Sequence, residues 1–537
     1  MVELLLTGRT ASAGFAAGPL TVMMSLEGKR AGGDPVSEAE ALRRAIADAL
    51  SQLSNLAACS EGDGADILAF QIAMLEDPAL AESAFEMIEA SASADQGWRM
   101  ALDAEINDYD TADNDHFKAR ASDLADIRDR VLTVLFGAAP RADPVPGAIM
   151  VGEDMTPSRF LATDWSRGGG IALTRGSASG HVATLARARG IPMIVGVATD
   201  LNGLSGRSEA FIDGENAVLC VDPTPETRDV FAARAKAADR ASATSSEFKM
   251  RPAVTADGVA IAVCLNIADP SEIERLDPGS CDGIGLVRTE FLFSGPGGLP
   301  DEETQYRAYR RLAEWAADKP VTIRTLDAGA DKPIAGLTLE HETNPFLGLR
   351  GIRLSLHRPE PFRTQLRALC RAAARGRVEV MLPMVSVPGE LEQARAYLEE
   401  AFSALQTVGI ACRRPELGVM IEVPAAALSV ESFDAAFFSI GSNDLTQYVM
   451  AAARDSEAVA ALNDPSHPAV LRLIAQVADY GARVGRKISL CGDAGGEPKF
   501  IEALLRAGLR SLSVSPAALG RTKEAIARVR LSQGGVQ

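Results

Sequence analysis

The chain has 537 residues and a formal net charge of −18. It is therefore long enough for more than one domain and too acidic for nucleic acid to be its general partner. Hydrophobic residues make up 47% and aromatic residues 5% of the sequence, which is typical of a folded α/β protein rather than a disordered one. No apolar run reaches the ~18 residues of a membrane span, the first four residues lack the basic stretch of a signal peptide, and the seven cysteines form no C-x-x-C pair. We expect a cytoplasmic protein with no membrane insertion, disulfide framework or zinc site.

The first part of the chain predicts strands followed by a bundle of helices. Residues 4–24 predict a short strand, a glycine- and alanine-rich turn over residues 14–18, and a second strand over residues 19–24. Ser37 and Glu40 match a capping box, and apolar residues at 42, 46, 50 and 53 then form one helical stripe. Further helices are predicted over residues 67–75, 80–88 and 115–136, so residues 34–143 are expected to form a helical bundle.

This bundle carries most of the excess negative charge. Residues 34–137 contain 22 Asp and Glu residues against 7 Lys and Arg residues. The excess indicates either ordinary solvated helix faces or a docking surface for a basic protein partner.

After the bundle, short apolar runs alternate with helices or loops. Strands are predicted over residues 148–151, 170–173, 193–195 and 210–212. Residues 1–33 and 144–222 therefore form one α/β domain into which the bundle is inserted. Residues 223–250, rich in alanine, arginine and lysine, predict a linker helix.

One histidine of the α/β domain has an unusual setting. Small residues over 176–180 lead to His181, and a helix-compatible segment over residues 182–189 follows until Gly190 stops it. His181 is therefore expected at a helix N-terminus, where free N–H groups and the helix dipole favour an anion. This position suits a histidine that accepts a phosphoryl group, and it equally suits one that caps a helix or lies in a surface loop.

From about residue 254 onward, eight strand-like runs alternate with helical segments. The runs are residues 259–267, 283–288, 321–327, 378–384, 417–423, 437–440, 488–491 and 512–514. This count and order predict a (β/α)8 TIM barrel over residues 251–537. The active site of that fold is built where the strands end, and polar or charged residues follow at least five of these runs.

Cationic side chains follow two neighbouring strands of the predicted barrel. Arg288 and Arg324 lie near the ends of the second and third runs, and each presents a planar fork for phosphate or carboxylate oxygens. Arg353 offers another fork and Lys332 a point charge. Any one of them alone is better explained by a surface ion pair. Two arginines at the same mouth of the barrel, the end at which the strands end, favour an anion site.

Other polar groups complete the predicted mouth. Glu422 and Asp444 are expected to end the fifth and sixth strands, and two carboxylates with open water positions suit Mg²⁺, unless they are structural groups bonded to loop amides. Asn443 offers donors to a carboxylate. Cys491 ends the seventh run; a thiol is protonated at neutral pH and suits a proton donor, although buried cysteines are more often inert. The mouth predicts a site for a small, Mg²⁺-bound anion that carries phosphate.

Seven ordered motifs lie between residues 176 and 496 of the chain. They are GSASGHVATLARARGIPMIVG (176–196), GIGLVRTEFLF (283–293), RTLDAGADKP (324–333), NPFLGLRGIR (344–353), GVMIEVPAAAL (418–428), FFSIGSNDLTQY (437–448) and CGDAGG (491–496). With these motifs the chain resembles Enzyme I of the phosphoenolpyruvate:sugar phosphotransferase system, and residues 74–80 and 117–132 resemble the helical docking subdomain of that family. The resemblance implies a phosphoenolpyruvate-protein phosphotransferase with a swivelling phosphohistidine domain.

The resemblance also implies partners and residue roles. Phosphoenolpyruvate would phosphorylate His181, which would pass the phosphoryl group to the histidine phosphocarrier protein HPr on the acidic bundle, and Cys491 would protonate the enolate to pyruvate. The other implied residues are Arg288, Arg324, Asn443, Asp444 and Arg454 for substrate, and Glu422 and Asp444 for Mg²⁺. A homodimer through the C-terminal barrel is implied as well, and residues 222–250 are the expected hinge.

Three residues depart from the family pattern. Ser177 stands where glycine is usual, Gly180 where a serine precedes the histidine, and Asp493 where glutamate follows Cys-Gly. Gly180 removes a hydroxyl that would bond to the imidazole or the phosphate. Two alternatives stay open: a regulatory phosphotransferase outside sugar transport, and a dikinase or phosphoenolpyruvate synthase relative, which would need an ATP-binding domain that nothing in the sequence supplies.

Overall fold

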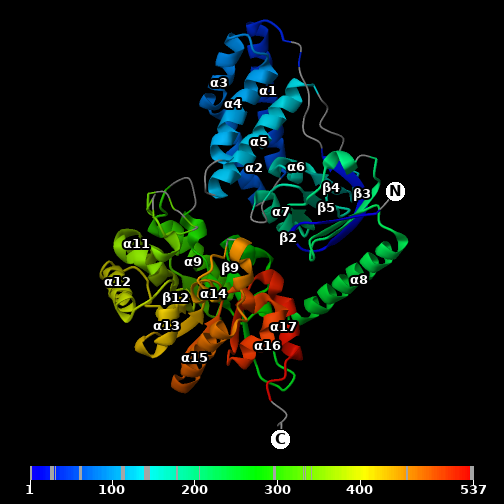
Figure 1. Ribbon diagram of the computed structural model, residues 1–537. Coiled ribbons are helices and arrows are strands. Elements are labelled where there is room, and N and C mark those ends of the chain that lie inside the picture. The colour runs from blue at the N-terminus through cyan, green and yellow to red at the C-terminus, as the bar shows by residue number, and fades with distance from the viewer. Residues whose placement is uncertain are drawn as a thin grey trace. The chain divides into compact units, whose positions relative to one another are not determined.

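The computed structural model describes residues 3–23, 30, 32–59, 63–110, 115–137, 145–176, 180–204, 206–293, 298–330, 332, 334, 336–339, 342–454 and 457–532. The chain divides into two units, residues 1–239 and 240–537, and the division falls inside the helix α8 (Pro225–Phe248) (Figure 1). Among the described residues, no helix has both the length and the apolar character needed to cross a membrane.

The first unit is built on a sheet whose strands have the order β1-β8-β7-β3-β4-β5-β6-β2. The strands are β1 (Leu4–Thr7), β2 (Arg9–Ser12), β3 (Phe15–Met23), β4 (Ile149–Gly152), β5 (Gly170–Leu173), β6 (Met193–Val195), β7 (Glu209–Asp213) and β8 (Val218–Val221). Strands β3 to β6 run parallel, and the remaining neighbours pair antiparallel. The four strands predicted after the bundle are confirmed, and β8 was not predicted.

The predicted turn over residues 14–18 is wrong, because residues 15–23 form the single strand β3. Gly18 lies inside this strand, and a Cβ atom there would come 2.0 Å from the Gly147 carbonyl oxygen. The glycine therefore allows two backbones to approach closely rather than a turn to form.

The helical bundle follows β3 and precedes β4 (Figure 1). It consists of α1 (Pro35–Ala58), α2 (Asp63–Glu76), α3 (Pro78–Glu89), α4 (Ala94–Asp110) and α5 (Asp115–Leu135). The predicted capping box at Ser37 is wrong: Asp34 caps α1, because its side chain accepts hydrogen bonds from the N–H groups of Val36 and Ser37 (3.1 Å each). The helix α4, with the fully buried Trp98, was not predicted.

The second unit is a closed parallel barrel of eight strands, which confirms the predicted TIM barrel. The strands are β9 (Ala262–Ile267), β10 (Ile284–Val287), β11 (Val321–Arg324), β12 (Val378–Leu382), β13 (Glu416–Ile421), β14 (Phe437–Ile440), β15 (Lys487–Leu490) and β16 (Ser511–Val514). The surrounding helices are α9 (Glu302–Ala316), α10 (Ile352–His357), α11 (Pro359–Ala372), α12 (Pro388–Thr407), α13 (Pro424–Leu428), α14 (Ser442–Met450), α15 (Pro468–Val484), α16 (Pro498–Arg506) and α17 (Leu519–Arg528).

The barrel is held by one large hydrophobic core between its strands and helices, with Val263, Ile323, Val380 and Ile440 among the fully buried members. Because such strands are buried on both faces, they appear in the sequence as continuous apolar runs. The first polar residue after each run therefore marks the end of a strand, and those ends build the site described next.

Candidate active site

His181 is the first residue of α7 (His181–Arg189), so the predicted helix N-terminus is confirmed. Gly180 is the N-cap residue and contributes no side-chain hydrogen bond, while Gly190 ends the helix with φ 66°. The Gly180 carbonyl oxygen accepts hydrogen bonds from the Thr184 N–H (3.0 Å) and hydroxyl (3.3 Å). The glycine at position 180 has no side chain to cap the first N–H groups of α7. Free N–H groups at the start of a helix favour the binding of an anion. Ser177 lies outside the described residues.

Arg324 ends β11 and lies between two carboxylates. It is only 5% exposed; Nη2 donates to Glu290 Oε1 (2.9 Å), and Nη1 lies 3.0 Å from Asp327 Oδ2. Burial lowers the pKa of Arg324 and these two carboxylates raise it, with a net increase, so the guanidinium stays charged. The Lys332 Nζ lies 3.5 Å from the same Asp327 oxygen. Arg288, by contrast, is exposed and pairs with no carboxylate of the described residues.

Arg350 is a fully buried arginine that joins two carboxylates of the barrel. Its Nε and Nη2 donate to the two Asp327 oxygens (3.0 Å each), and its Nη1 and Nη2 donate to the two Asp444 oxygens (3.2 and 2.9 Å). Arg353, the arginine predicted from this stretch, bonds instead to carbonyl and hydroxyl oxygens. Between the two arginines Gly351 has φ 57°; Arg350 before it is fully buried, and Arg353 after it is only partly buried.

Glu422 and Asp444 are both buried, at 1% and 5% exposure. Glu422 directly follows β13, and its Oε1 accepts the Met384 N–H (2.6 Å). Asp444 does not end a strand as predicted: it lies in the first turn of α14, where the chain has already become helical. Burial, with the charges of Asp444 and Asp327, raises the pKa of Glu422 to about 8.

A divalent cation would relieve this repulsion, and hard carboxylate oxygens are the ligands that Mg²⁺ prefers. The two carboxylates therefore fit the predicted ion. Across the described parts of the chain, no three His, Cys, Asp or Glu side chains are grouped so as to hold a metal. Mg²⁺ in proteins commonly binds one or two carboxylates and keeps water and substrate oxygens as its other ligands.

Asn443 and Asp493 fix each other across the ends of β14 and β15. The Asn443 Nδ2 donates to Asp493 Oδ2 (2.8 Å), and the Asp493 N–H donates to Asn443 Oδ1 (3.0 Å). Since the amide nitrogen has two hydrogens and one of them is donated to Asp493, Asn443 keeps the other N–H for a ligand oxygen. The Arg454 Nη1 lies 3.7 Å from Asp444 Oδ1, so a third predicted substrate residue reaches the same side of the barrel.

Cys491 follows β15 and is 3% exposed. Burial is the main cause that raises its pKa to about 11, and the Glu422 charge adds to it, while Ser439, Arg324 and Arg288 act in the opposite direction. The thiol is therefore protonated at neutral pH. The next residue is glycine because a Cβ atom at Gly492 would lie 1.9 Å from the Ser442 hydroxyl oxygen, so the ends of β14 and β15 come together only at a glycine.

The barrel thus brings its predicted residues to the carboxyl ends of its strands, while His181 lies in the other unit. Glu290 and Asp327, the two carboxylates that contact Arg324, lie in the predicted stretches, but no role was predicted for them. Their signal was the acid placed two or three residues beyond a strand-ending arginine.

Comparison with known proteins shows to which family the chain belongs. Residues 242–531 match the model described as PEP-utilising enzyme, PEP-binding domain, and residues 7–120 and 144–217 match the N-terminal and mobile domains of PEP-utilising enzymes. A phosphoenolpyruvate-protein phosphotransferase of Bacillus sp. (strain S) is 36% identical over 497 residues, which cover 91% of this chain and 86% of that protein. The chain belongs to the phosphoenolpyruvate-protein phosphotransferase family.

Other members of this family show comparable similarity. The phosphoenolpyruvate-protein phosphotransferase of Haloferax volcanii is 37% identical over 85% of this chain and 80% of its own length. That of Bacillus subtilis (strain 168) is 35% identical over 84% of this chain and 80% of its own length. The resemblance given by the seven sequence motifs is confirmed.

Proposed function

We propose that the chain transfers the phosphoryl group of phosphoenolpyruvate to its own His181 and then to a histidine of an HPr-like phosphocarrier, releasing pyruvate as the first step of sugar uptake by a phosphotransferase system. One observation carries the proposal most directly: cationic Arg324, the acidic pair Glu422 and Asp444, and the protonated Cys491 thiol meet at one end of the barrel. This set matches a phosphorylated enol that must lose its phosphoryl group and gain a proton.

The arginines bind and neutralise the phosphate in this proposal. Phosphoryl transfer needs mainly alignment and charge neutralisation, which Arg288 and Arg324 supply with planar forks. A neutral His181 nitrogen attacks the phosphorus in line, so that a P–N bond forms while the P–O bond to the enol breaks. Burial raises the pKa of the Cys491 thiol, so that the thiol is protonated, and it gives this proton to the enolate carbon.

Asn443 and Arg454 orient the remainder of the substrate. The free N–H of Asn443 donates to a carboxylate oxygen, and Arg454, already close to Asp444, offers a cation to the same group. Glu422 and Asp444 would hold Mg²⁺, which would neutralise developing charge on the phosphate oxygens.

The acidic bundle is the docking surface for the phosphocarrier in this proposal. Residues 45–98 contain ten Asp and Glu residues and no Lys or Arg, and several of the acids on α2 and α3 are exposed: Glu76, Asp77, Glu82, Glu86 and Glu89. A single-sign surface of this kind steers a basic partner and raises its association rate. Phe70, 40% exposed on α2, would add an apolar anchor.

The domain boundaries follow the proposed roles. Residues 1–33 and 144–222 form the phosphohistidine domain, residues 34–143 the inserted phosphocarrier-binding subdomain, residues 223–250 the linker helix, and residues 251–537 the phosphoenolpyruvate-binding barrel. The linker acts as the hinge that lets His181 alternate between donor and acceptor. The protein works in the cytoplasm, where phosphoenolpyruvate is available.

A homodimer through the barrel is also proposed. Its support is a set of exposed leucines on a loop and two short 3-10 helices of the second unit: Leu339, Leu347 and Leu462 are 44%, 65% and 46% exposed. Sedimentation of the full chain tests this, and a monomer at micromolar concentration would contradict it.

Labelled phosphoenolpyruvate with Mg²⁺ tests the central transfer. We expect acid-labile label on the wild-type chain, no label on His181→Ala, and release of that label to an added phosphocarrier. Label retained by His181→Ala would refute the assignment. Cys491→Ser should slow pyruvate formation strongly, and unchanged turnover would remove it as the proton donor.

Charge reversal tests the docking surface. Glu82→Lys combined with Glu86→Lys should raise the KM for the phosphocarrier, and added salt should shrink the difference from wild type. The matched control is Asp229→Lys on α8, an exposed acid outside the bundle. Equal effects of the bundle and control variants would contradict the docking assignment.

A further inference from the structure

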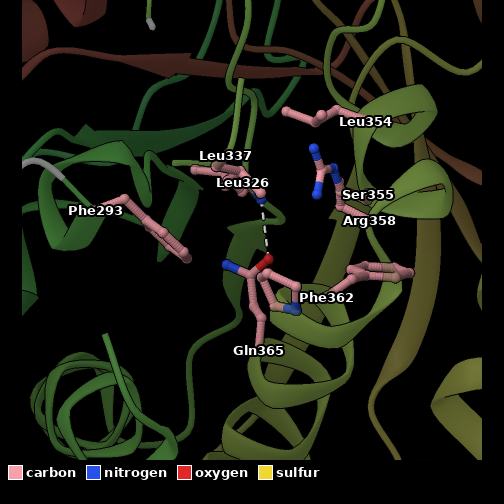
Figure 2. A pocket seen from close by; sticks show the side chains of 9 residues that line it. Phe293, Leu326, Leu337, Leu354, Ser355, Arg358, Phe362 and Gln365 are labelled. Carbon is pink, nitrogen blue, oxygen red and sulfur yellow. Dashed lines mark hydrogen bonds between the residues drawn. The ribbon is translucent and has the colours of Figure 1, made fainter. Parts of the chain in front are cut away.

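A buried chain of hydrogen bonds lies behind the two arginine-bearing strand ends of the barrel. At its centre is Gln365 on α11, which is 1% exposed and accepts the Leu326 N–H at Oε1 (3.0 Å); Figure 2 shows this bond as a dashed line beside a cavity lined by Phe293, Leu337 and Leu354. The Gln365 amide nitrogen donates to the Thr289 hydroxyl (3.3 Å) and the Tyr309 hydroxyl (3.0 Å). Thr289 and Tyr309 are fully buried.

The donor and the acceptor of each hydrogen bond in this buried network can be assigned. Thr289 accepts from Gln365 and donates its own proton to the Arg324 carbonyl oxygen (3.1 Å). Tyr309 accepts from Gln365 and donates to Gln305 Oε1 (3.1 Å), and burial raises the pKa of this phenol, which keeps its proton in place. Gln365 therefore has two arms: one reaches the strand end at Arg324, and the other leads away to α9.

The strand ends need this connection because their backbone ladder is irregular. Between β10 and β11 the pairing shifts from Ile284 with Val321 to Val287 with Ile323, so the register of these two strands changes just before Arg288 and Arg324. Thr289 stands between Arg288 and Glu290, and Leu326 lies two residues beyond Arg324. One glutamine thus ties both segments that carry the proposed phosphate ligands.

We infer that Gln365, acting through the Thr289 hydroxyl, is a positioning residue that sets the separation of Arg288 and Arg324 for the phosphate of the substrate. The inference rests on the proposed function of those two arginines. Gln365 and Thr289 touch no substrate in this role: they hold the backbone from which the two guanidinium groups extend. Since a phosphate contact made in both ground and transition state mainly affects binding, their loss raises KM more than it lowers kcat.

The two arms of Gln365 provide matched variants. Thr289→Val removes the arm to Arg324, and Tyr309→Phe removes the arm to α9; each deletes one buried hydroxyl and leaves the shape nearly unchanged. We expect Thr289→Val to raise the KM for phosphoenolpyruvate by about five- to tenfold, as loss of one buried hydrogen bond allows, with kcat within about twofold. Tyr309→Phe should lower the melting temperature and leave the KM within about twofold, because its lost bond lies away from the strand ends. Thr289→Ser, which keeps the hydroxyl, should restore the wild-type KM.

The assay is labelling of His181 in the full chain by phosphoenolpyruvate with Mg²⁺. Equal changes in KM for Thr289→Val and Tyr309→Phe, or none for Thr289→Val, would overturn the inference. Should Thr289→Val lack native circular dichroism, Gln365→Glu replaces it. The carboxylate cannot donate to either hydroxyl, so it breaks both arms while keeping the side-chain shape. Because Tyr309→Phe measures the effect of the α9 arm alone, Gln365→Glu must raise the KM by more than Tyr309→Phe does. An unlabelled wild-type chain would instead refute the proposed function, and labelling with an unaltered KM in these variants refutes only the role of Gln365.

Discussion

Replacing Arg350 with methionine tests the organisation of the barrel mouth. The change removes four charge-assisted hydrogen bonds to Asp327 and Asp444. Asp327 keeps two cations, the Arg324 guanidinium at 3.0 Å and the Lys332 ammonium at 3.5 Å. Asp444 keeps only the longer 3.7 Å contact with the partly exposed Arg454 among the described residues. The variant therefore leaves Asp444 as a buried carboxylate without a close cation.

Breaking a buried ion pair from one side costs about 3–5 kcal/mol. For a unit of about 300 residues this corresponds to a decrease of about 5–8 °C in its melting temperature. Calorimetry of the full chain measures the decrease directly. Arg353→Met is the matched control, since among the described residues Arg353 bonds to neutral oxygens alone, and it should lower the melting temperature by less than about 2 °C.

Two results would refute this reasoning. A loss below about 1 kcal/mol for Arg350→Met would mean that the pair stabilises no more than an exposed one. Equal losses for the two arginine variants would mean that burial does not distinguish them.

Three further predictions concern other parts of the molecule. Gly180→Ser adds a side-chain N-cap to α7 and should stabilise the first unit by a few tenths of a kcal/mol, visible as slower amide exchange at the start of the helix; faster exchange would contradict it. Gly492→Ala places a Cβ atom against Ser442 and should cost about 1–3 kcal/mol and lower the turnover, because overpacking moves the ends of β14 and β15; a wild-type denaturation curve would contradict it. Burial raises the pKa of three barrel thiols to about 11 or 12, so the folded state keeps protons that the unfolded state loses above pH ~9. The free energy of unfolding should therefore fall as the pH rises above ~9, by up to about 1.4 kcal/mol per pH unit for each thiol. Urea titrations between pH 8 and ~10.5 measure this, and a flat profile would contradict it; the thiols are Cys264, Cys370 and Cys491.

The barrel was predictable because its physics is local in the sequence. Strands buried on both faces require continuous apolar runs, and the residue after each run must lie at the same end of the barrel. Arg324 is the last residue of such a strand, and Arg288, Glu422 and Cys491 directly follow one, so all four could be selected by this rule. The helix start at His181 was equally local, because small residues precede it and Gly190 ends it.

What the sequence did not reveal depends on long-range geometry. Arg350 and Arg353 have the same chemistry three residues apart, and only the folded structure distinguishes them: Arg350 bonds to Asp327 and Asp444, whereas Arg353 bonds to carbonyl and hydroxyl oxygens. Gln365 resembles any polar residue of an amphipathic helix until β11 is placed beside it. The N-cap of α1 was misplaced because Asp34 and Ser37 are both good capping residues, and the Pro35 between them, suited to the first helical position, favoured the earlier one.

The two carboxylates on Arg324 have a consequence for ligand choice. Its guanidinium is already matched by Glu290 and Asp327, so an incoming molecule gains only the difference between its own attraction and theirs. A singly charged carboxylic acid offers no more than the groups already present, whereas a phosphate monoester brings two charges on three oxygens of one small group. In the proposed function the resident acids thus act as internal competitors, and the mouth of the barrel selects its ligand by density of charge as well as by shape.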